Sequence, residues 1–369
     1  MQNSTVIIEQ LNGQIRDNVE SIFNQLAPKS FNGGTVLIKP NMVGPSAPEL
    51  GHTTDPELVQ AVVQACLDRG AKVSVGDNPG GMKSSSAKVA KITGILEASN
   101  GCYKSISERV SETKGVDTGF PLVVSSIVRD ADYVINLPRM KTHLFMYVTG
   151  ALKNTYGYVA GACKARLHLD ASERPNFAKA TCDIYQVRPP ELNIMDAKTA
   201  IEGNGPCHGG HMRQVGKLLA SADALALDSV MARMMGADPR LLPVQMEAAD
   251  RKLGNIDEDK IDIIGNMEII PGFKMPITFT PEIYDEEARN KLKGLYPRNM
   301  MQTRVTIKPI HDIDKCTDCL ECVESCPVEA LTMHPEFVVD DKCISCFCCV
   351  ELCPEGALEV PDIEAFQHY

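Results

Sequence analysis

The sequence predicts an α/β fold, a mostly parallel sheet with flanking helices, followed by a small cysteine-rich α+β module. Strand-like and helix-like segments alternate before His311, which is typical of βαβ units. After His311, two copies of one cysteine pattern occur 27 residues apart, which indicates a duplicated unit. We therefore expect domains at residues 1–307 and 308–369. Residues 270–307 are predicted to be a connecting strap, because their prolines and charges show little periodicity.

The first strand and helix are predicted between residues 36 and 69. Val36–Ile38 is a short apolar run after a Gly-Gly turn. A helical pattern follows from Glu57 to Arg69, with Asp55 in the N-cap position and Pro56 at the first helical position. Gly70 ends the helix, and residues 72–75 read as the next strand. Further strands are predicted at 133–136 and 192–195, and a helix at about 223–235.

Polar side chains follow each of the four predicted strands. In open α/β sheets, ligands bind outside the carboxyl ends of the strands, so we expect these side chains to meet in one pocket. The candidates are Lys39 and Asn41 after the first strand, Asp77 after the second, Asn136, Lys141 and His143 at the third, and Asp196 and Glu202 after the fourth.

Lys141 and His143 are the strongest catalytic candidates. They are two residues apart, so an extended backbone places both side chains on the same face. A histidine with a pKa near neutrality exchanges protons at physiological pH, and a lysine stabilises negative charge. The alternative for His143 is a structural hydrogen bond. For Lys39 and Lys153 the alternative is a solvated surface charge.

Two glycine-containing segments are candidate ligand sites. The turn Asp77–Gly81 has a backbone that could approach a ligand closely, but it is neither a Walker loop nor G-x-G-x-x-G. The sequence therefore supports no flavin or nicotinamide site. Cys207, His208 and His211 offer three metal-ligating side chains in one loop. One loop rarely supplies a closed site, so we favour a loop without metal and leave the alternative open.

The cysteine repeat carries the most specific chemistry in the chain. Each copy reads C-x2-C-x2-C-x3-C-P, the run that binds [4Fe-4S] clusters in bacterial ferredoxins, where the fourth cysteine serves the other cluster. Zinc and disulfides are the alternatives, although zinc rarely shows the C-P ending. Cys348 lies between ligand positions and is predicted to be a non-ligating thiol. The predicted ligands are Cys316, Cys319, Cys322 and Cys353 for cluster 1, and Cys343, Cys346, Cys349 and Cys326 for cluster 2.

The negative charge of the chain is concentrated in the cysteine-rich module. The formal net charge is −11, yet residues 311–369 contain 14 Asp or Glu against 2 Lys, and residues 1–310 sum to +1. Such a field steers a redox partner with a basic docking face; the alternative is that the acidic residues only keep the module soluble. Clustered Lys and Arg, which nucleic acid binding requires, are lacking.

Composition also bears on location. The 14 cysteines, the absence of an apolar run of 18 residues and a start unlike a signal peptide predict a cytoplasmic protein without a membrane span. Exposed clusters would favour an anaerobic cell. The sequence does not indicate the oligomeric state.

Four segments resemble the iron–sulfur centre proteins known as domain of unknown function 362. They are Val36–Asn41, Asn136–His143, Gly150–Asn154 and Glu202–Pro206, and a tandem ferredoxin module commonly accompanies that domain. The resemblance covers about residues 35–265 and the C-terminal module. It implies a redox-linked role in anaerobic or facultative microbes and assigns no catalytic residue. Lys153 and Asn154 enter the candidate site through this resemblance, alongside the strand-end residues.

These observations favour an enzyme or enzyme component, an oxidoreductase in which two [4Fe-4S] clusters exchange single electrons with a small anionic substrate. Lys141 and His143 would supply charge stabilisation and protons, while Lys39, Lys153 and Asp77 would position the substrate. The alternative is an electron carrier that binds a partner, or a maturation factor for a metallocofactor, without turnover of its own. The 300 or so residues before the module exceed what a carrier needs.

Overall fold

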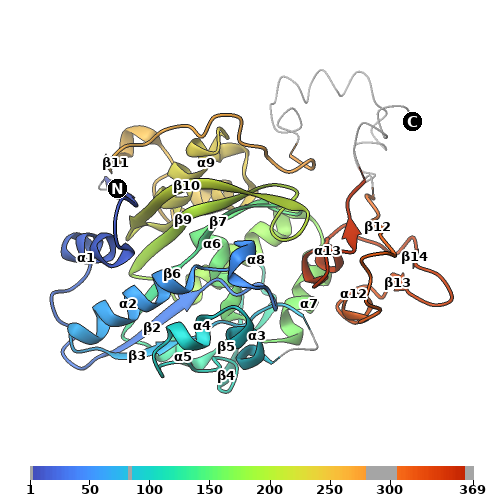
Figure 1. Ribbon diagram of the computed structural model, residues 1–369, viewed down its shortest axis with the longest axis horizontal. Coiled ribbons are helices and arrows are strands. Elements are labelled where there is room, and N and C mark those ends of the chain that lie inside the picture. Colours follow the sequence, from blue (N-terminus) through green and yellow to red (C-terminus); the bar gives the residue numbers. More distant parts are fainter. Residues whose placement is uncertain (1–2, 82–84, 280–305, 362–369) are drawn as a thin grey trace.

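The computed structural model describes residues 3–81, 85–279 and 306–361 (Figure 1). A large body contains a nine-stranded sheet between layers of helices, and the small C-terminal module lies against one side of it. Of the strap predicted at 270–307, residues 280–305 lie outside the described ranges. None of the helices in the described ranges has the length and apolar character needed to cross a membrane.

The large sheet is mixed, with mostly parallel pairing. Its strands are β1 (Ser4–Gln10), β2 (Thr35–Pro40), β3 (Lys72–Val75), β6 (Tyr133–Leu137), β7 (Arg139–His143), β8 (Tyr147–Thr149), β9 (Leu192–Gly203), β10 (Gly210–Ser221) and β11 (Ile261–Ile264). Their order is β11-β1-β10-β9-β6-β2-β3, and β7 pairs with both β9 and β8. Only β1–β10, β9–β10 and β7–β8 are antiparallel. The predicted α/β class is confirmed.

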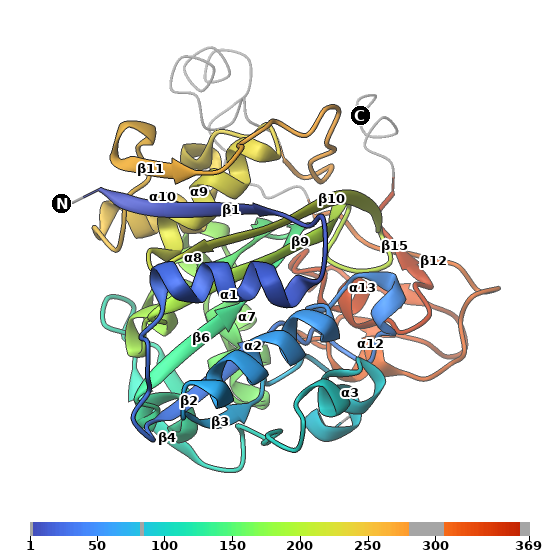
Figure 2. The same cartoon turned by 60° about the vertical axis from the view of Figure 1, so that its left-hand side comes forward.

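Helices cover both faces of the sheet (Figures 1 and 2). One layer contains α1 (Ile15–Leu26), α2 (Pro56–Asp68), α3 (Ser86–Ile92) and α4 (Ile95–Ala98); the other contains α6 (Ala151–Asn154), α8 (Arg174–Val187), α9 (Ala224–Met234) and α10 (Pro243–Asp250). In β2, Val36 and Ile38 pack in the core beneath α1–α4, and Leu37 packs in the core on the opposite face, with α6, α8, α9 and α10. Because alternate strand residues point to opposite faces, a strand buried on both sides is continuously apolar.

Several predicted elements form where the sequence placed them. β2, β3, β6, α2 and α9 all match, and the Asp55 carboxylate accepts the amide hydrogen of Glu57 at 2.8 Å as the N-cap of α2. Two segments differ. The loop expected after residue 195 is a continuation of β9, which pairs with β10. Residues 139–143, expected to follow a strand, form the strand β7 themselves.

Other elements surround the sheet edge. They are the hairpin of β4 (Val110–Lys114) and β5 (Pro121–Ser125), and the helices α5 (Ser126–Asp130) and α7 (Ala162–Asp170). In Figure 1, α7 lies between the sheet and the C-terminal module.

The C-terminal module shows the expected internal repeat. It contains α12 (Glu321–Glu324), α13 (Cys348–Leu352) and two short strand pairs, β12 (Ile310–His311) with β15 (Leu358–Glu359) and β13 (Leu331–Thr332) with β14 (Val338–Val339). The 27-residue offset relates the start of α12 to that of α13, and β13 to β15. The two copies of the repeat thus have corresponding helices and strands.

Glycines allow the module to approach the α/β body closely. A Cβ atom on Gly80 would lie 2.8 Å from Leu352 Cδ2, and one on Gly81, whose φ is +89°, would lie 2.7 Å from Glu321 Oε1. On another side, a Cβ atom on Gly356 would lie 2.7 Å from His208 Cβ. Glycine is required where backbones approach this closely, so the turn Asp77–Gly81 contacts the module.

Candidate functional site: a cleft between the sheet and the cysteine-rich module

A cleft of about 890 Å³, its open mouth included, lies where the carboxyl ends of β2 and β3 meet the module. The α/β body contributes Lys39, Asn41, Asp77, Asn78, His143, Lys153, Asn154, Tyr156, Lys164 and His168, and the module contributes Ser325, Cys348, Glu351 and Leu352. Six of the residues predicted from the sequence therefore line one cavity: Lys39, Asn41, Asp77, His143, Lys153 and Asn154.

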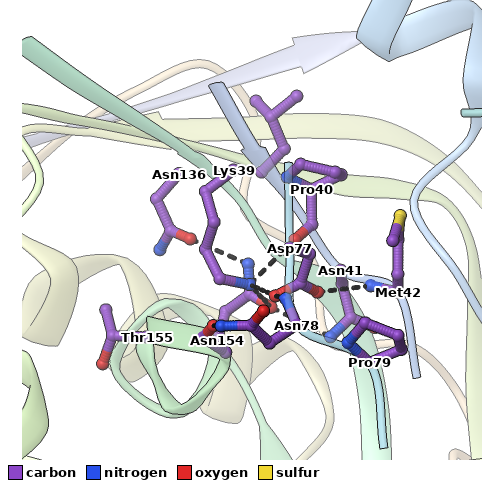
Figure 3. Close-up of polar contacts among 12 residues, drawn as sticks. Lys39, Pro40, Asn41, Met42, Asp77, Asn78, Pro79, Asn136, Asn154 and Thr155 are labelled. Carbon is purple, nitrogen blue, oxygen red and sulfur yellow. Dashed lines mark hydrogen bonds and ion pairs between the residues drawn. The ribbon is translucent and has the colours of Figure 1, made fainter. Parts of the chain in front are cut away.

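Lys39 and Asp77 form a buried ion pair in the wall of the cleft (Figure 3). The Lys39 ammonium lies 2.8 Å from Asp77 Oδ1 and donates to the Pro40 carbonyl at 2.9 Å and to Asn154 Oδ1 at 3.2 Å. Three acceptors match its three hydrogens. Burial lowers the pKa of Lys39, while the charge of Asp77 raises it.

The Asp77 carboxylate is also fully engaged. Its Oδ2 accepts the amide hydrogen of Met42 and its Oδ1 that of Asn78, both at 2.8 Å. A Cβ atom on Gly157 would lie 1.9 Å from Asp77 Oδ1 and 2.7 Å from Lys39 Nζ. Lys39 and Asp77 therefore hold the wall of the cleft. The sequence predicts that they position the substrate, but in the structure both charged groups are bonded to each other and to neighbouring protein groups.

A chain of amide side chains lies behind this wall. Asn41 Nδ2 donates to Asn154 Oδ1 at 2.9 Å, and Asn154 Nδ2 donates to Asn136 Oδ1 at 2.8 Å. Lys141 Nζ donates to Asn41 Oδ1 and to the His52 carbonyl, both at 2.7 Å, and burial lowers its pKa to about 8. Asn136 and Lys141 do not line the cleft; they position the residues that do.

His143 presents a neutral ring to the cleft. Its Nδ1 accepts the amide hydrogens of Phe145 at 3.1 Å and of Met146 at 3.4 Å, so the ring proton is on Nε2. That atom lies 3.6 Å from Glu351 Oε2 of the module. Burial, and then the charge of Lys153, hold the pKa of His143 well below its usual value. The expected titration near neutrality is thus wrong, and the neutral ring carries its proton on Nε2.

Lys153 and Lys164 face the cleft without a carboxylate partner. Their ammonium groups lie 5.7 and 5.6 Å from the centroid of the Tyr156 ring, and within the described ranges neither joins an ion pair with Asp or Glu. Lys164 donates to the backbone carbonyls of Asn78 and Pro79. Burial lowers the pKa of both lysines, that of Lys164 to about 8.

Sequence reasoning missed Tyr156, Lys164 and His168. His168 stacks on Phe177 with ring centroids 4.6 Å apart, and its buried Nδ1 has no hydrogen-bond partner in the described structure. Burial lowers its pKa to about 3. Lys164 and His168 are four residues apart, which places both on one face of a helix. This spacing is visible in the sequence, but neither residue follows a predicted strand.

Asp196 and Glu202 do not reach the cleft. Asp196 pairs with Arg139 and accepts the amide hydrogen of Asp55 at 2.8 Å, and Glu202 accepts that of Lys274 at 3.2 Å. Because β9 continues through Gly203, Asp196 lies within a strand and Glu202 near its far end. Their predicted role in the pocket is wrong.

The loop with Cys207 and His208 lines a separate small cavity together with His143 and Glu351. His211 lies on β10 and is exposed. Over residues 3–81, 85–279 and 306–361, no three His, Cys, Asp or Glu side chains are placed to hold a single metal ion.

Two cavities within the module are lined by the cysteine quartets expected from the repeat. One is lined by Cys316, Cys319, Cys322 and Cys353, and the other by Cys326, Cys343, Cys346 and Cys349. Each cavity is lined by four cysteines in the predicted ligand positions, three from one copy and one from the other, which are the donor set of a [4Fe-4S] cluster; Cys348 also lines the second cavity. The residues therefore fit two such clusters.

Comparison with known proteins agrees with this organisation. The model of "Domain of unknown function (DUF362)" matches residues 36–233, and that of the "4Fe-4S dicluster domain" matches residues 308–354. A thylakoid-associated protein of Synechocystis sp., sll1697, is 35% identical over 229 residues, which are 60% of this chain and 68% of the relative.

Two solved structures show weaker likeness. The lactate racemase apoprotein from Thermoanaerobacterium thermosaccharolyticum aligns over 64% of this chain and 57% of its own, with 12% identity and a TM-score of 0.42. A protein from Thermotoga maritima aligns over 57% of this chain and 55% of its own, with 12% identity and a TM-score of 0.37. Such low scores give no information about the site.

Proposed function

Since the chain belongs to the family of domain of unknown function 362 and carries a 4Fe-4S dicluster domain, we propose that it is an oxidoreductase or oxidoreductase component acting on a small anionic substrate in the cleft. The dicluster domain gives the chain an iron–sulfur electron-transfer role. When bound, the clusters supply one-electron transfer. One observation supports the proposal above all: Cys348, Glu351 and Leu352 of the module form one wall of the cleft.

The charges in the cleft favour an anion. Lys39 and Asp77 neutralise one another, which leaves Lys153 and Lys164 against Glu351. Removing a lysine from water is costly unless an opposite charge compensates, and an anionic ligand would compensate both. Charge-assisted hydrogen bonds to a carboxylate are the strongest that these lysines can make. We therefore infer that the substrate carries a carboxylate.

His143 would act on the substrate as a neutral donor. Its Nε2–H faces the cleft beside Glu351, and a neutral imidazole can polarise a carbonyl by hydrogen bonding without first losing a charge. Lys153 and Lys164 would hold the carboxylate while His143 contacts the reacting group. Electrons would be exchanged singly with an external redox protein that has a basic docking face. A carrier would need no such cleft between its module and a second domain.

The test compares Lys153→Gln with the control Lys72→Gln, which changes an exposed lysine on β3. The full chain is purified anaerobically, its iron is counted, and its clusters are reduced with dithionite. Thermal unfolding and reoxidation are then followed with acetate, pyruvate, succinate, citrate and inorganic phosphate. We expect at least one carboxylate to stabilise the native protein and the control, and to reoxidise their clusters, with both effects lost in Lys153→Gln.

Two results would contradict the proposal. One is iron-free protein with no paramagnetic signal after dithionite. The other is a protein with both clusters whose unfolding temperature and reoxidation rate respond to none of these anions. A response to phosphate alone would retain the anion site and reject the carboxylate.

A further inference from the structure

Among the residues that the structure describes, only Cys348 lines both the cleft and a cysteine-quartet cavity. It borders the cleft together with Lys153 and Tyr156, and it borders the cavity of Cys326, Cys343, Cys346 and Cys349. The cavity of the other quartet has no lining residue in common with the cleft. Cluster 2 is therefore the cluster next to the cleft, and Cys348 lies between the two.

The backbone turns sharply just before Cys348. Ser345 and Phe347 have positive φ values of 49° and 60°, and α13 begins at Cys348. Cys348 lines the same cavity as Cys346, a predicted cluster ligand two residues away, and a side-chain hydrogen bond with Cys346 raises the pKa of the Cys348 thiol. A thiol is a weak donor, and a thiolate sulfur is its natural acceptor here. Cys348 is thus placed to contact the cluster through a ligand and not to replace one.

The internal repeat provides a comparison within the same molecule. Asp318 and Leu320 have the positive φ values that Ser345 and Phe347 have 27 residues later. The residue that corresponds to Cys348 is Glu321, whose Oε1 accepts the hydroxyl hydrogen of Ser325 at 3.0 Å. The extra thiol therefore occurs in only one half of the module, the half whose cluster cavity adjoins the cleft.

We propose that Cys348 is a positioning residue whose thiol donates a hydrogen bond to Cys346 Sγ and so raises the reduction potential of the cluster beside the cleft. Hydrogen bonds to cluster sulfurs withdraw electron density and are a main determinant of cluster potentials. The inference rests on the proposed function for its cluster assignment. A higher reduction potential at cluster 2, beside the cleft, would favour electron flow from cluster 1 to cluster 2 and so toward the cleft. Cluster 1 is the outer cluster, since its predicted ligand Cys319 is exposed.

The experiment is a redox titration of the full anaerobic chain followed by paramagnetic resonance, without substrate. Cys348→Ala removes the donor, Cys348→Ser keeps a hydroxyl donor of similar size, and Cys102→Ala removes a remote thiol as the control. We expect two cluster potentials in the native chain. Cys348→Ala should lower one of them and leave the other unchanged, while Cys348→Ser and Cys102→Ala should resemble the native chain.

Three other results would contradict either this inference or the proposed function. If Cys348→Ala and Cys348→Ser both lose about half of the iron, Cys348 is a ligand and the inference is wrong. If both potentials in Cys348→Ala equal the native values, the hydrogen bond does not tune the cluster, and the inference is again wrong while the proposed function stands. If the native chain binds no clusters, the proposed function itself has failed.

Discussion

At the scale of single residues, four lysines near the cleft differ in what surrounds their ammonium groups. Lys39 has three acceptors including a carboxylate, Lys141 has two oxygen acceptors, Lys164 has backbone carbonyls, and Lys153 has neither carboxylate nor carbonyl partner within the described ranges. All four are buried enough for their pKa values to fall. The hydrogen-bond and ion-pair partners of each ammonium group thus distinguish a lysine that holds the wall of the cleft from one that is available to a ligand.

This difference predicts that replacing lysine by methionine changes the free energy of unfolding differently at Lys39 and at Lys153. Lys39→Met leaves the Asp77 carboxylate buried without its ion-pair partner, and breaking such a pair costs about 3–5 kcal/mol. Lys153→Met removes a cation without a carboxylate partner, so we expect its free energy of unfolding to be unchanged or higher. Urea unfolding followed by circular dichroism measures both. Equal destabilisation by the two variants would contradict the assignment of Lys39 to the wall.

Buried histidines predict how stability depends on pH. Burial lowers the pKa of His52 and of His168 to about 3, and that of His143 also falls. Below the unfolded value of about 6.5, the unfolded chain binds protons that the folded chain does not, so stability decreases as pH falls. Between about pH 7.5 and 5.5, we expect the unfolding temperature to drop.

A pair of variants isolates this effect. His168→Phe, which keeps an aromatic ring against Phe177, should show a smaller drop than the native chain. His211→Gln, at an exposed position, should show the native drop. If removing His168 leaves the pH dependence unchanged, this histidine is not held neutral by the fold.

At the scale of elements, the ends of strands decide which side chains reach the cleft. β2 and β3 end at the cleft and deliver Lys39 and Asp77 to it. β9 does not end where its apolar run ends, because hairpin pairing with β10 extends it to Gly203. Pairing of this kind depends on a partner strand, which the periodicity of a single segment does not reveal.

The short helix η2 (Thr155–Tyr158) offers a test of how tightly these elements pack. Gly157→Ala would place a methyl group 1.9 Å from Asp77 Oδ1, which must displace the ion pair with Lys39. We expect a loss of several kcal/mol, as for other disrupted buried pairs. Gly44→Ala is the matched control, since nothing lies within 4 Å of its added Cβ. Urea midpoints measure both, and similar midpoints would contradict the packing described here.

At the scale of the whole molecule, the acidic module and the near-neutral α/β body differ in charge. The module contributes one wall of the cleft on its inner side, while its exposed ion pairs and acidic residues face solvent. The excess negative charge therefore lies in the module that contains the cysteine quartets and not in the α/β body. Under the proposed function, this separation lets one chain attract a basic protein partner and a small anion at different places.

Salt dependence tests this separation. We expect the reduced protein to transfer electrons to a basic cytochrome c at a rate that falls as ionic strength rises to about 0.15 M, where the screening length is about 8 Å. With an acidic electron acceptor the rate should rise instead. Stopped-flow absorbance measures both, and rates independent of salt would assign the acidic residues to solubility alone.

The sequence by itself determined the α/β class, the repeat and its cysteine quartets, and four residues of the cleft (Lys39, Asn41, Asp77 and His143), because these depend on local periodicity, spacing and strand ends; the family resemblance added Lys153 and Asn154. Only the tertiary structure decided that Lys164 and His168 of α7 join the cleft, that Asp196 and Glu202 do not, and that Cys348 and Glu351 close one wall. Those contacts join segments far apart in the chain, and their positions follow from the packing of α7 and the module on the sheet edge, which no single segment specifies.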